Sequence, residues 1–394
     1  MNFTEITILL LLLVMTVPDF CRRIGRPALT YAVYLLCGML INPFLDLDIR
    51  QALRTVGEIG FILLLFEIGL EVDIPRLKTM ITPFRRATAW ILLQVPVLLF
   101  VAMTCGFPLT VSLIAVAGFC GCSVGMAFQG WYHYPLHPRQ AKADFLYWMI
   151  LLEVIAMIVL SAGGALLGNG LGFGLLLSIS GIILTIALIA VFGDTLARRV
   201  AYFSRSTLRW RAHFWILFVL AAVSIARRLG LPPPKAAFFL GLAISRTTHE
   251  GLALEHHLRP IGQHLLIPVF FLSLGASTQP AAWFSITGWH ALLTAAIILL
   301  LRRLITRPIL QEAGGPYPHW IASPNLTIAA VAAEVLSQAN VPHGPIAWLL
   351  MSSTLVTLYA ILAQPSLPEP NPANHPLEAA SPDTANPKVP RLQA

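Results

Sequence analysis

The sequence predicts an all-α polytopic membrane protein, and three observations lead to this fold class. Of the 394 residues, 57% are hydrophobic and 11% are charged, whereas soluble domains carry about 25% charged residues. Unbroken apolar runs recur along the chain, each close to the ~20 residues that a membrane-spanning helix needs. Basic residues gather on one side of these runs, as the positive-inside rule requires. A transmembrane β-barrel is excluded, because its strands would alternate between apolar and polar residues.

The apolar runs, and the residues that break them, predict about thirteen transmembrane helices. The predicted spans are residues 5–21, 28–43, 56–72, 87–106, 109–127, 144–167, 171–193, 212–229, 233–246, 262–278, 285–304, 321–338 and 343–363. Charged residues follow the first run without a small-residue cleavage site, so we interpret it as a retained helix rather than a signal peptide. These spans together define a membrane domain over residues 1–363.

The last segment, residues 364–394, shows no apolar periodicity. Eight of its 31 residues are proline, a composition typical of disordered chain. We therefore expect a disordered, proline-rich tail after the membrane domain.

The distribution of Lys and Arg predicts the orientation of the chain. When the spans cross alternately, 21 of the 26 basic residues fall on one side, and the other side holds Arg50, Arg54, Arg227, Arg228 and Lys235. Basic residues are enriched in cytoplasmic loops, so we expect an outside N-terminus and a cytoplasmic tail in a plasma (inner) membrane. This topology accounts for the net charge of +8. The lipid bilayer is therefore the expected partner of the basic surface, and no nucleic acid is expected.

Two halves of the chain, about 22–167 and 227–363, show a weak repeat at an offset of 205 residues. The identical pairs are Arg22 and Arg227, Arg23 and Arg228, Gly25 and Gly230, Pro27 and Pro232, Ala32 and Ala237, Leu35 and Leu240, Gly57 and Gly262, Ile62 and Ile267, and Phe66 and Phe271. The offset relates spans seven crossings apart, which run in opposite directions. Such an inverted-topology repeat is the architecture of many secondary transporters, with the substrate site near the midplane between the halves.

Two spans at corresponding positions of the halves contain residues that interrupt helices. These residues are Gly121, Cys122 and Gly125 in the fifth span, and Pro324, Asn325 and Thr327 in the twelfth. Irregular backbone inside a membrane is tolerated only where protein or a water-filled cavity satisfies its polar groups. We expect both spans to unwind and to cross near the bilayer centre. The alternative is a helix whose small residues pack closely against a neighbour.

Three glutamates, Glu67, Glu153 and Glu334, lie within apolar runs. A carboxylate in the bilayer core costs about 3 kcal/mol on insertion scales, so it needs a partner or a function. Glu67 either contributes to a cation route or faces a cavity wall. Glu334 is expected to be solvated near the outer surface.

Glu153 is the most informative of the three acids, because it lies near mid-depth in the span after the first interrupted helix. An apolar environment disfavours the charged form of a carboxyl group, so a buried carboxylate can exchange protons in the physiological range. Such a site holds either a proton or a small cation, and this exclusion combined with alternating exposure produces antiport. The alternatives are a structural ion pair with an arginine, or a neutral acid hydrogen-bonded in the core.

Arg302 and Arg303 are the possible charge partners of the buried acids. They flank the eleventh span on the inside if it covers residues 285–304. They lie in mid-membrane, and can neutralise Glu153, if the span instead covers residues 289–310.

No motif supports an enzyme or an ATP-driven pump, because the Walker, Rossmann and nucleophile-elbow patterns are missing from the sequence. The five cysteines lie in or beside apolar runs of the first third, and without histidines at ligand spacing they form neither a disulfide framework nor a zinc site. No cofactor and no resident metal are expected.

Three stretches carry a resemblance to a known family: GEIGFILLLFEIGLEVD at 57–73, RRLGLPPPKAAFFLGLAIS at 227–245, and RPIGQHLLIPVFFLSLGAST at 259–278. In order and spacing they resemble the monovalent cation:proton antiporters of the second branch, the membrane domain of sodium/hydrogen exchangers and potassium-efflux antiporters. The likeness covers about residues 1–363.

The resemblance implies a fold with two crossing broken helices around a carboxylate, and homodimers are usual in resembling families. Ser123 matches the family's small hydroxyl residue in the first crossing helix, and Glu153 falls where its essential aspartate is expected. The family has Asp, Asn or Gln before that acid, whereas Leu152 stands here. One carboxylate instead of two fits electroneutral exchange better than electrogenic exchange. Arg302 or Arg303 is nearest to the family's basic residue.

These observations predict a secondary active transporter that exchanges Na⁺ or K⁺ for protons by alternating access. Glu153 is the predicted shared carboxylate, with Ser123 and Glu67 as further cation- or proton-binding residues. The alternatives on the same fold are a passive or gated cation channel, and a membrane scaffold or sensor that transports nothing.

Overall fold

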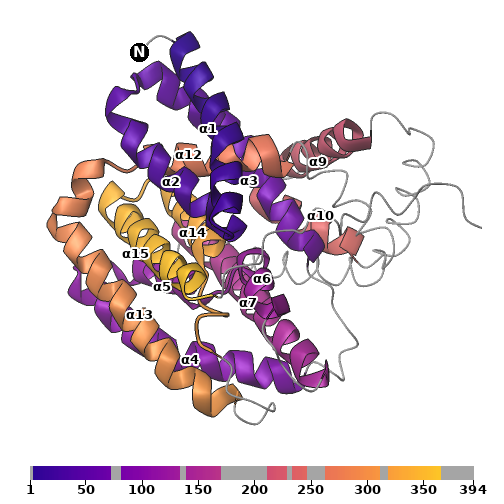
Figure 1. Ribbon diagram of the computed structural model, residues 1–394, viewed down its shortest axis with the longest axis vertical. Coiled ribbons are helices and arrows are strands. Elements are labelled where there is room, and N and C mark those ends of the chain that lie inside the picture. The colour runs from indigo at the N-terminus through magenta and orange to yellow at the C-terminus, as the bar shows by residue number, and fades with distance from the viewer. Residues whose placement is uncertain are drawn as a thin grey trace, which may run out of the picture.

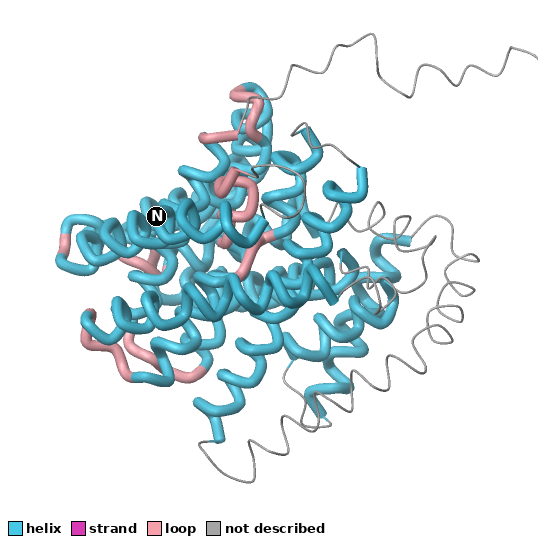
Figure 2. The backbone as a smooth tube through the Cα atoms, turned by 90° about the horizontal axis from the view of Figure 1, so that it is seen from below, coloured by secondary structure: helices cyan, strands magenta, loops and turns pink. Residues whose placement is uncertain are grey.

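The computed structural model describes residues 3–71, 81–133, 139–169, 211–228, 233–245, 262–310 and 318–364. Every regular element in these ranges is a helix (Figures 1 and 2). The predicted span 171–193 lies outside the described residues, and so does the predicted tail except for Gln364.

The helices follow the apolar runs of the sequence. They are α1 (Phe3–Arg23), α2 (Thr30–Ile41), α3 (Leu47–Glu71), α4 (Ile81–Thr104), α5 (Leu109–Cys120), α6 (Val124–His133), α7 (Arg139–Asn169), α9 (Arg211–Arg228), α10 (Pro233–Ser245), α12 (Ile267–Ala276), α13 (Ile286–Leu310), α14 (Leu326–Gln338) and α15 (His343–Leu362), with a π-helical turn, η4 (Gly262–Leu266), before α12. Within the described ranges, six segments are long and apolar enough to cross a membrane.

The helix surfaces are those of an integral membrane protein. On α4, Trp90 and Gln94 are fully buried, whereas Leu92 and Phe100 are 64% and 69% exposed. The outer face of α13 likewise exposes Leu300. Large apolar side chains on an outer surface are costly in water, but they match the hydrocarbon of a bilayer. The exposed faces of α4 and α13 are therefore lipid-facing.

Two groups of helices make up the described fold. In the first group α2 packs on α12 and α3 packs on α10, while α4, α5, α7, α13, α14 and α15 pack together in the second. In Figure 1, α9 and α10 lie beside α3 on one side of the molecule, and α4, α13 and α15 lie on the other.

Glycines allow the closest contact of the first group. A Cβ on Gly38 of α2 would overlap the carbonyl oxygen of Leu272 on α12, and one on Gly275 of α12 would overlap that of Leu35 on α2. Only glycine permits such an approach of two backbones, which is the usual role of small residues between membrane helices.

Four pairs of helices lie about 205 residues apart in the chain, which is the offset of the weak sequence repeat. Shifting α4 by this offset gives 286–309, and α13 spans Ile286–Leu310. The same shift relates α2 to α10, α3 to α12, and α7 to α15. The packing shows the same correspondence. The contact between α2 and α12 corresponds to the contact between α10 and α3.

Candidate functional site

The fifth predicted span is interrupted in the middle. Helix α5 ends at Cys120, Gly121 is extended with φ −70° and ψ 163°, and α6 begins at Val124. A Cβ on Gly121 would lie 2.8 Å from Cγ2 of Ile328 on α14. The extended peptide 121–123 therefore lies directly against α14, where a larger residue does not fit.

The chain before α14 is irregular in the same place. Residues 323–325 have no helical structure, and the backbone N–H of Ser123 donates to the carbonyl oxygen of Pro324 at 2.7 Å. The amide of Asn325 donates to the Phe119 carbonyl at 3.3 Å. These bonds join the two irregular peptides, which we call the crossing (residues 121–123 and 323–325).

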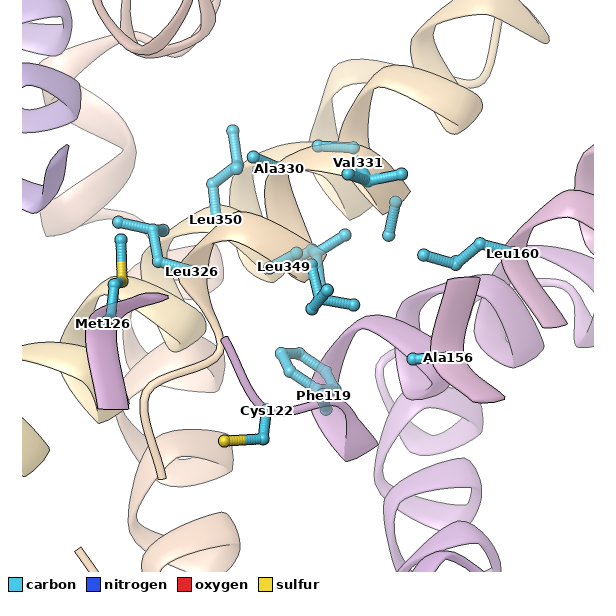
Figure 3. Close-up of a cluster of buried hydrophobic side chains, with 14 of the residues drawn as sticks. Phe119, Cys122, Met126, Ala156, Leu160, Leu326, Ala330, Val331, Leu349 and Leu350 are labelled. Carbon is cyan, nitrogen blue, oxygen red and sulfur yellow. The ribbon is translucent and has the colours of Figure 1, made fainter. Parts of the chain in front are cut away.

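Apolar side chains enclose the crossing. Figure 3 shows Phe119 and Cys122 at the break, surrounded by Met126 of α6, Ala156 and Leu160 of α7, Leu326, Ala330 and Val331 of α14, and Leu349 and Leu350 of α15. All ten side chains are buried. The polar groups of the crossing are thus buried among apolar side chains, where each of them needs a partner.

Two hydroxyl groups meet beside the crossing. Ser123 is 1% exposed, and its Oγ accepts hydrogen bonds from the backbone N–H of Thr327 at 3.1 Å and from the Thr327 hydroxyl. The Ser123 carbonyl accepts bonds from Met126 and Ala127 in the first turn of α6. Ser123 thereby caps the N-terminus of α14 with its side chain and begins α6 with its backbone.

Glu153 lies in α7 and is 2% exposed. Its Oε2 accepts a hydrogen bond of 3.2 Å from the backbone N–H of Val124, the first residue of α6. A helix N-terminus carries partial positive charge and unpaired N–H groups, so it favours an anion. The broken helix therefore provides a stabilising environment for the carboxylate of Glu153 at the centre of the helix group.

Arg302 lies in α13 and is fully buried. Its Nη1 donates to the Ser323 carbonyl at 2.6 Å, and its Nη2 donates to the carbonyls of Phe119 and, at 3.4 Å, Gly121. The C-terminal carbonyls of a helix carry partial negative charge. Arg302 thus compensates the partial negative charge at the buried C-terminal end of α5, as Glu153 does for the partial positive charge at the start of α6.

The structure distinguishes the two arginines between which the sequence left a choice. Arg302 is fully buried inside the helix group, whereas Arg303 is exposed, and helix α13 continues past both to Leu310. The described hydrogen bonds of Arg302 go to backbone carbonyls and to Gln94 rather than to a carboxylate.

The remaining residues predicted from the sequence make none of the hydrogen bonds described above for Ser123, Glu153 and Arg302. Glu67 is 7% exposed in α3, where a Cβ on Gly262 would lie 2.6 Å from its Oε1. Cys122 is fully buried at the crossing, and Gly125 is exposed in the first turn of α6. The expectation of a solvated Glu334 is wrong: it is 8% exposed and accepts a bond of 3.1 Å from Gln338.

Two polar residues at the crossing were missed by the sequence analysis. Gln94 of α4 accepts a bond from Nε of Arg302 at 3.3 Å. Thr357 of α15 accepts a bond of 3.2 Å from the backbone N–H of Asn325. In the sequence, Gln94 is marked by being a single amide in the apolar run of α4. Thr357 belongs to a hydroxyl-rich run in α15.

Replacing Ser123 with alanine is expected to destabilise the protein. The change removes the hydroxyl that accepts hydrogen bonds from Thr327, and with it the side-chain cap of α14; loss of such a cap costs about 1 kcal/mol. We expect the unfolding temperature in detergent to fall by about 2 °C. Ser277→Ala is the matched control, because that residue is exposed and its hydroxyl donates to the carbonyl of Leu274 in its own turn; equal effects of both changes would contradict the role of Ser123.

Comparison with known proteins gives a match to one family and to individual relatives. The sequence matches the family described as Sodium/hydrogen exchanger, transmembrane, over residues 8–365. A relative named Probable Na(+)/H(+) antiporter 3, from Methanocaldococcus jannaschii, is 23% identical over 315 residues, which are 77% of this chain and 79% of the relative. K(+) efflux antiporter 1, chloroplastic, from Arabidopsis thaliana is 28% identical over 291 residues, which are 69% of this chain and 24% of that longer protein.

Solved structures show the same fold. The structure of the sodium proton antiporter MjNhaP1 from Methanocaldococcus jannaschii at pH 8 matches with a TM-score of 0.62 and 17% identity, over 90% of this chain and 94% of that chain. An electron-microscopy structure of MjNhaP1 matches with a TM-score of 0.59 and 15% identity, over 92% of this chain and 95% of that chain.

Proposed function

The chain belongs to the sodium/hydrogen exchanger family, and on this basis we propose that it exchanges a monovalent cation, Na⁺ or K⁺, for protons. Glu153 is the shared binding group. One observation carries this proposal: the Glu153 carboxylate is buried at the N-terminus of α6, where it bonds the N–H of Val124. The residue before Val124 is Ser123, whose hydroxyl meets that of Thr327.

The chemistry of these groups suits competition between a proton and a cation. Carboxylate and hydroxyl oxygens are the ligands that hard cations prefer. The N–H of Val124 stabilises the charged form of Glu153, which is the form that binds a cation, while protonation removes that charge. A proton and a cation therefore exclude each other at Glu153. Since Arg302 keeps its charge throughout, Glu153 is the group that changes its occupant, and the exchange of one monovalent cation for one proton is electroneutral.

Alternating access completes the exchange. The two groups of helices rearrange so that the crossing opens to one side of the membrane at a time, as in transporters built from inverted repeats. This proposal includes about thirteen spans with opposite orientation of the two halves, an outside N-terminus, a disordered cytoplasmic tail, residence in the plasma (inner) membrane, and a homodimer. Glu67, buried in the other helix group, is proposed as a second acid on the cation route.

The experiment that tests this function measures a proton gradient in everted membrane vesicles. Vesicles that contain the protein should lose the gradient when Na⁺, K⁺ or Li⁺ is added, and the cation that acts at the lowest concentration identifies the substrate. Vesicles without the protein are the control. A cation channel would instead give currents that do not depend on the proton gradient, and a scaffold would give neither response.

A further inference from the structure

We propose that Gln94 is a positioning residue for the exchange: its amide holds the Arg302 guanidinium on the crossing and leaves the positive charge uncompensated. This inference rests on the proposed function. It assigns a role to a residue of α4, a helix that contributes no other polar side chain among the described contacts of the crossing.

The amide of Gln94 is fixed at both ends. Its side chain is fully buried. The Nε2 group donates to the backbone carbonyl of Trp90 at 3.2 Å, so Oε1 is turned toward Arg302 and accepts from its Nε at 3.3 Å. A guanidinium carries donors only, so this is the one orientation in which the amide serves both partners.

The contact with Gln94 sets the plane of the guanidinium. The Nη1 and Nη2 groups of Arg302 bond the carbonyls of Ser323, Phe119 and Gly121, and its Nε donates to Gln94. Because the fork of donors is planar and rigid, fixing Nε from α4 fixes the direction of the other donors toward both peptides of the crossing. Without this contact the guanidinium is free to tilt, and the peptide that leads to Val124 and Glu153 loses its support.

The choice of an amide also sets the charge of the site. The titratable groups described near Arg302 are Cys120 and Cys122 of the crossing, and Cys122 is within electrostatic range of both Arg302 and Glu153. A carboxylate at position 94 would pair with Arg302 and neutralise it in a low-dielectric environment. A neutral amide offers Arg302 the same kind of acceptor and leaves the positive charge of Arg302 in place at the crossing.

Two substitutions separate orientation from charge. Gln94→Leu removes the acceptor, and we expect the cation concentration for half-maximal exchange to rise about 10-fold, as for other residues that orient a binding group. Gln94→Glu keeps the acceptor and neutralises Arg302. For this variant we expect a cation affinity closer to wild type, with half-maximal exchange moved to a higher pH by about one unit. The matched control is Gln51→Leu, the same chemical change at an exposed position of α3.

The measurements are exchange in everted vesicles over a range of cation concentrations and pH, with thermal unfolding in detergent to establish folding. Wild-type affinity and pH dependence in both variants would overturn the role of Gln94 while the proposed function stands. If Gln94→Leu does not fold, Gln94→Glu decides: a shifted pH dependence supports the proposal, and an unchanged one overturns it. Failure of the wild-type protein to exchange any cation would instead refute the proposed function, and this inference with it.

Discussion

Replacing Glu153 with glutamine is expected to reduce exchange to the rate of vesicles that lack the protein. Glutamine has the same shape and can still accept the bond from the Val124 N–H, but it neither binds a proton nor offers a charge to a cation. Both halves of the exchange cycle are lost together. The fold should persist, because a neutral amide is less costly to bury than a carboxylate.

Two further variants make the Glu153 result specific. Glu153→Asp keeps the charge on a shorter side chain, so we expect slower exchange with weaker cation affinity. Glu58→Gln is the matched control, since Glu58 is 55% exposed on α3, and it should exchange like wild type. If Glu153→Gln dissipates the proton gradient as fast as wild type, the assignment of the shared carboxylate is wrong.

Replacing Arg302 with methionine is expected to have the largest effect on stability. The change removes the donor to the carbonyls of Gly121 and Ser323 and one of the two donors to the carbonyl of Phe119, and these groups are enclosed by protein. A buried polar group left without its partner costs about 1–3 kcal/mol, so a loss of roughly 3 kcal/mol or more is expected. Because the crossing positions the helix N-terminus that faces Glu153, exchange should fall together with stability.

Two further variants, Arg302→Lys and Arg303→Met, provide the comparison for Arg302→Met. Arg302→Lys retains the charge but offers a single ammonium in place of a planar fork, so we expect partial stability and partial exchange. Arg303→Met changes an exposed side chain of the same helix and should alter neither. Thermal unfolding in detergent and vesicle exchange measure both effects. An unfolding temperature of Arg302→Met equal to that of wild type would show that the crossing does not depend on this residue.

The sequence predicts the helical membrane class and the family resemblance, because both depend on local patterns. Long apolar runs define helices whatever their packing. An acid in such a run is conspicuous for the same reason, so Glu153 and Glu67 stand out from the order of residues alone. Glycine and proline in the fifth and twelfth spans likewise mark the places where the backbone leaves the helix.

The environment of the charged residues could not be predicted in the same way. Apolar residues continue after Arg302, so hydropathy alone does not fix where the span ends, and the partners of Arg302 are backbone carbonyls that have no sequence signature. Gln94 is 208 residues away from Arg302 in the chain. Glu334 was expected in solvent because it lies near a span end, but burial depends on the tertiary cover of α14.

Proton release on cation binding tests the shared site most directly. Purified protein can be titrated with its cation by calorimetry, in two buffers of different ionisation enthalpy, at a series of pH values. Competition at Glu153 predicts that cation binding releases up to one proton, with the number approaching one as the pH falls and with none released by Glu153→Gln. Cation binding to the wild-type protein without any proton release, at every pH, would contradict the account.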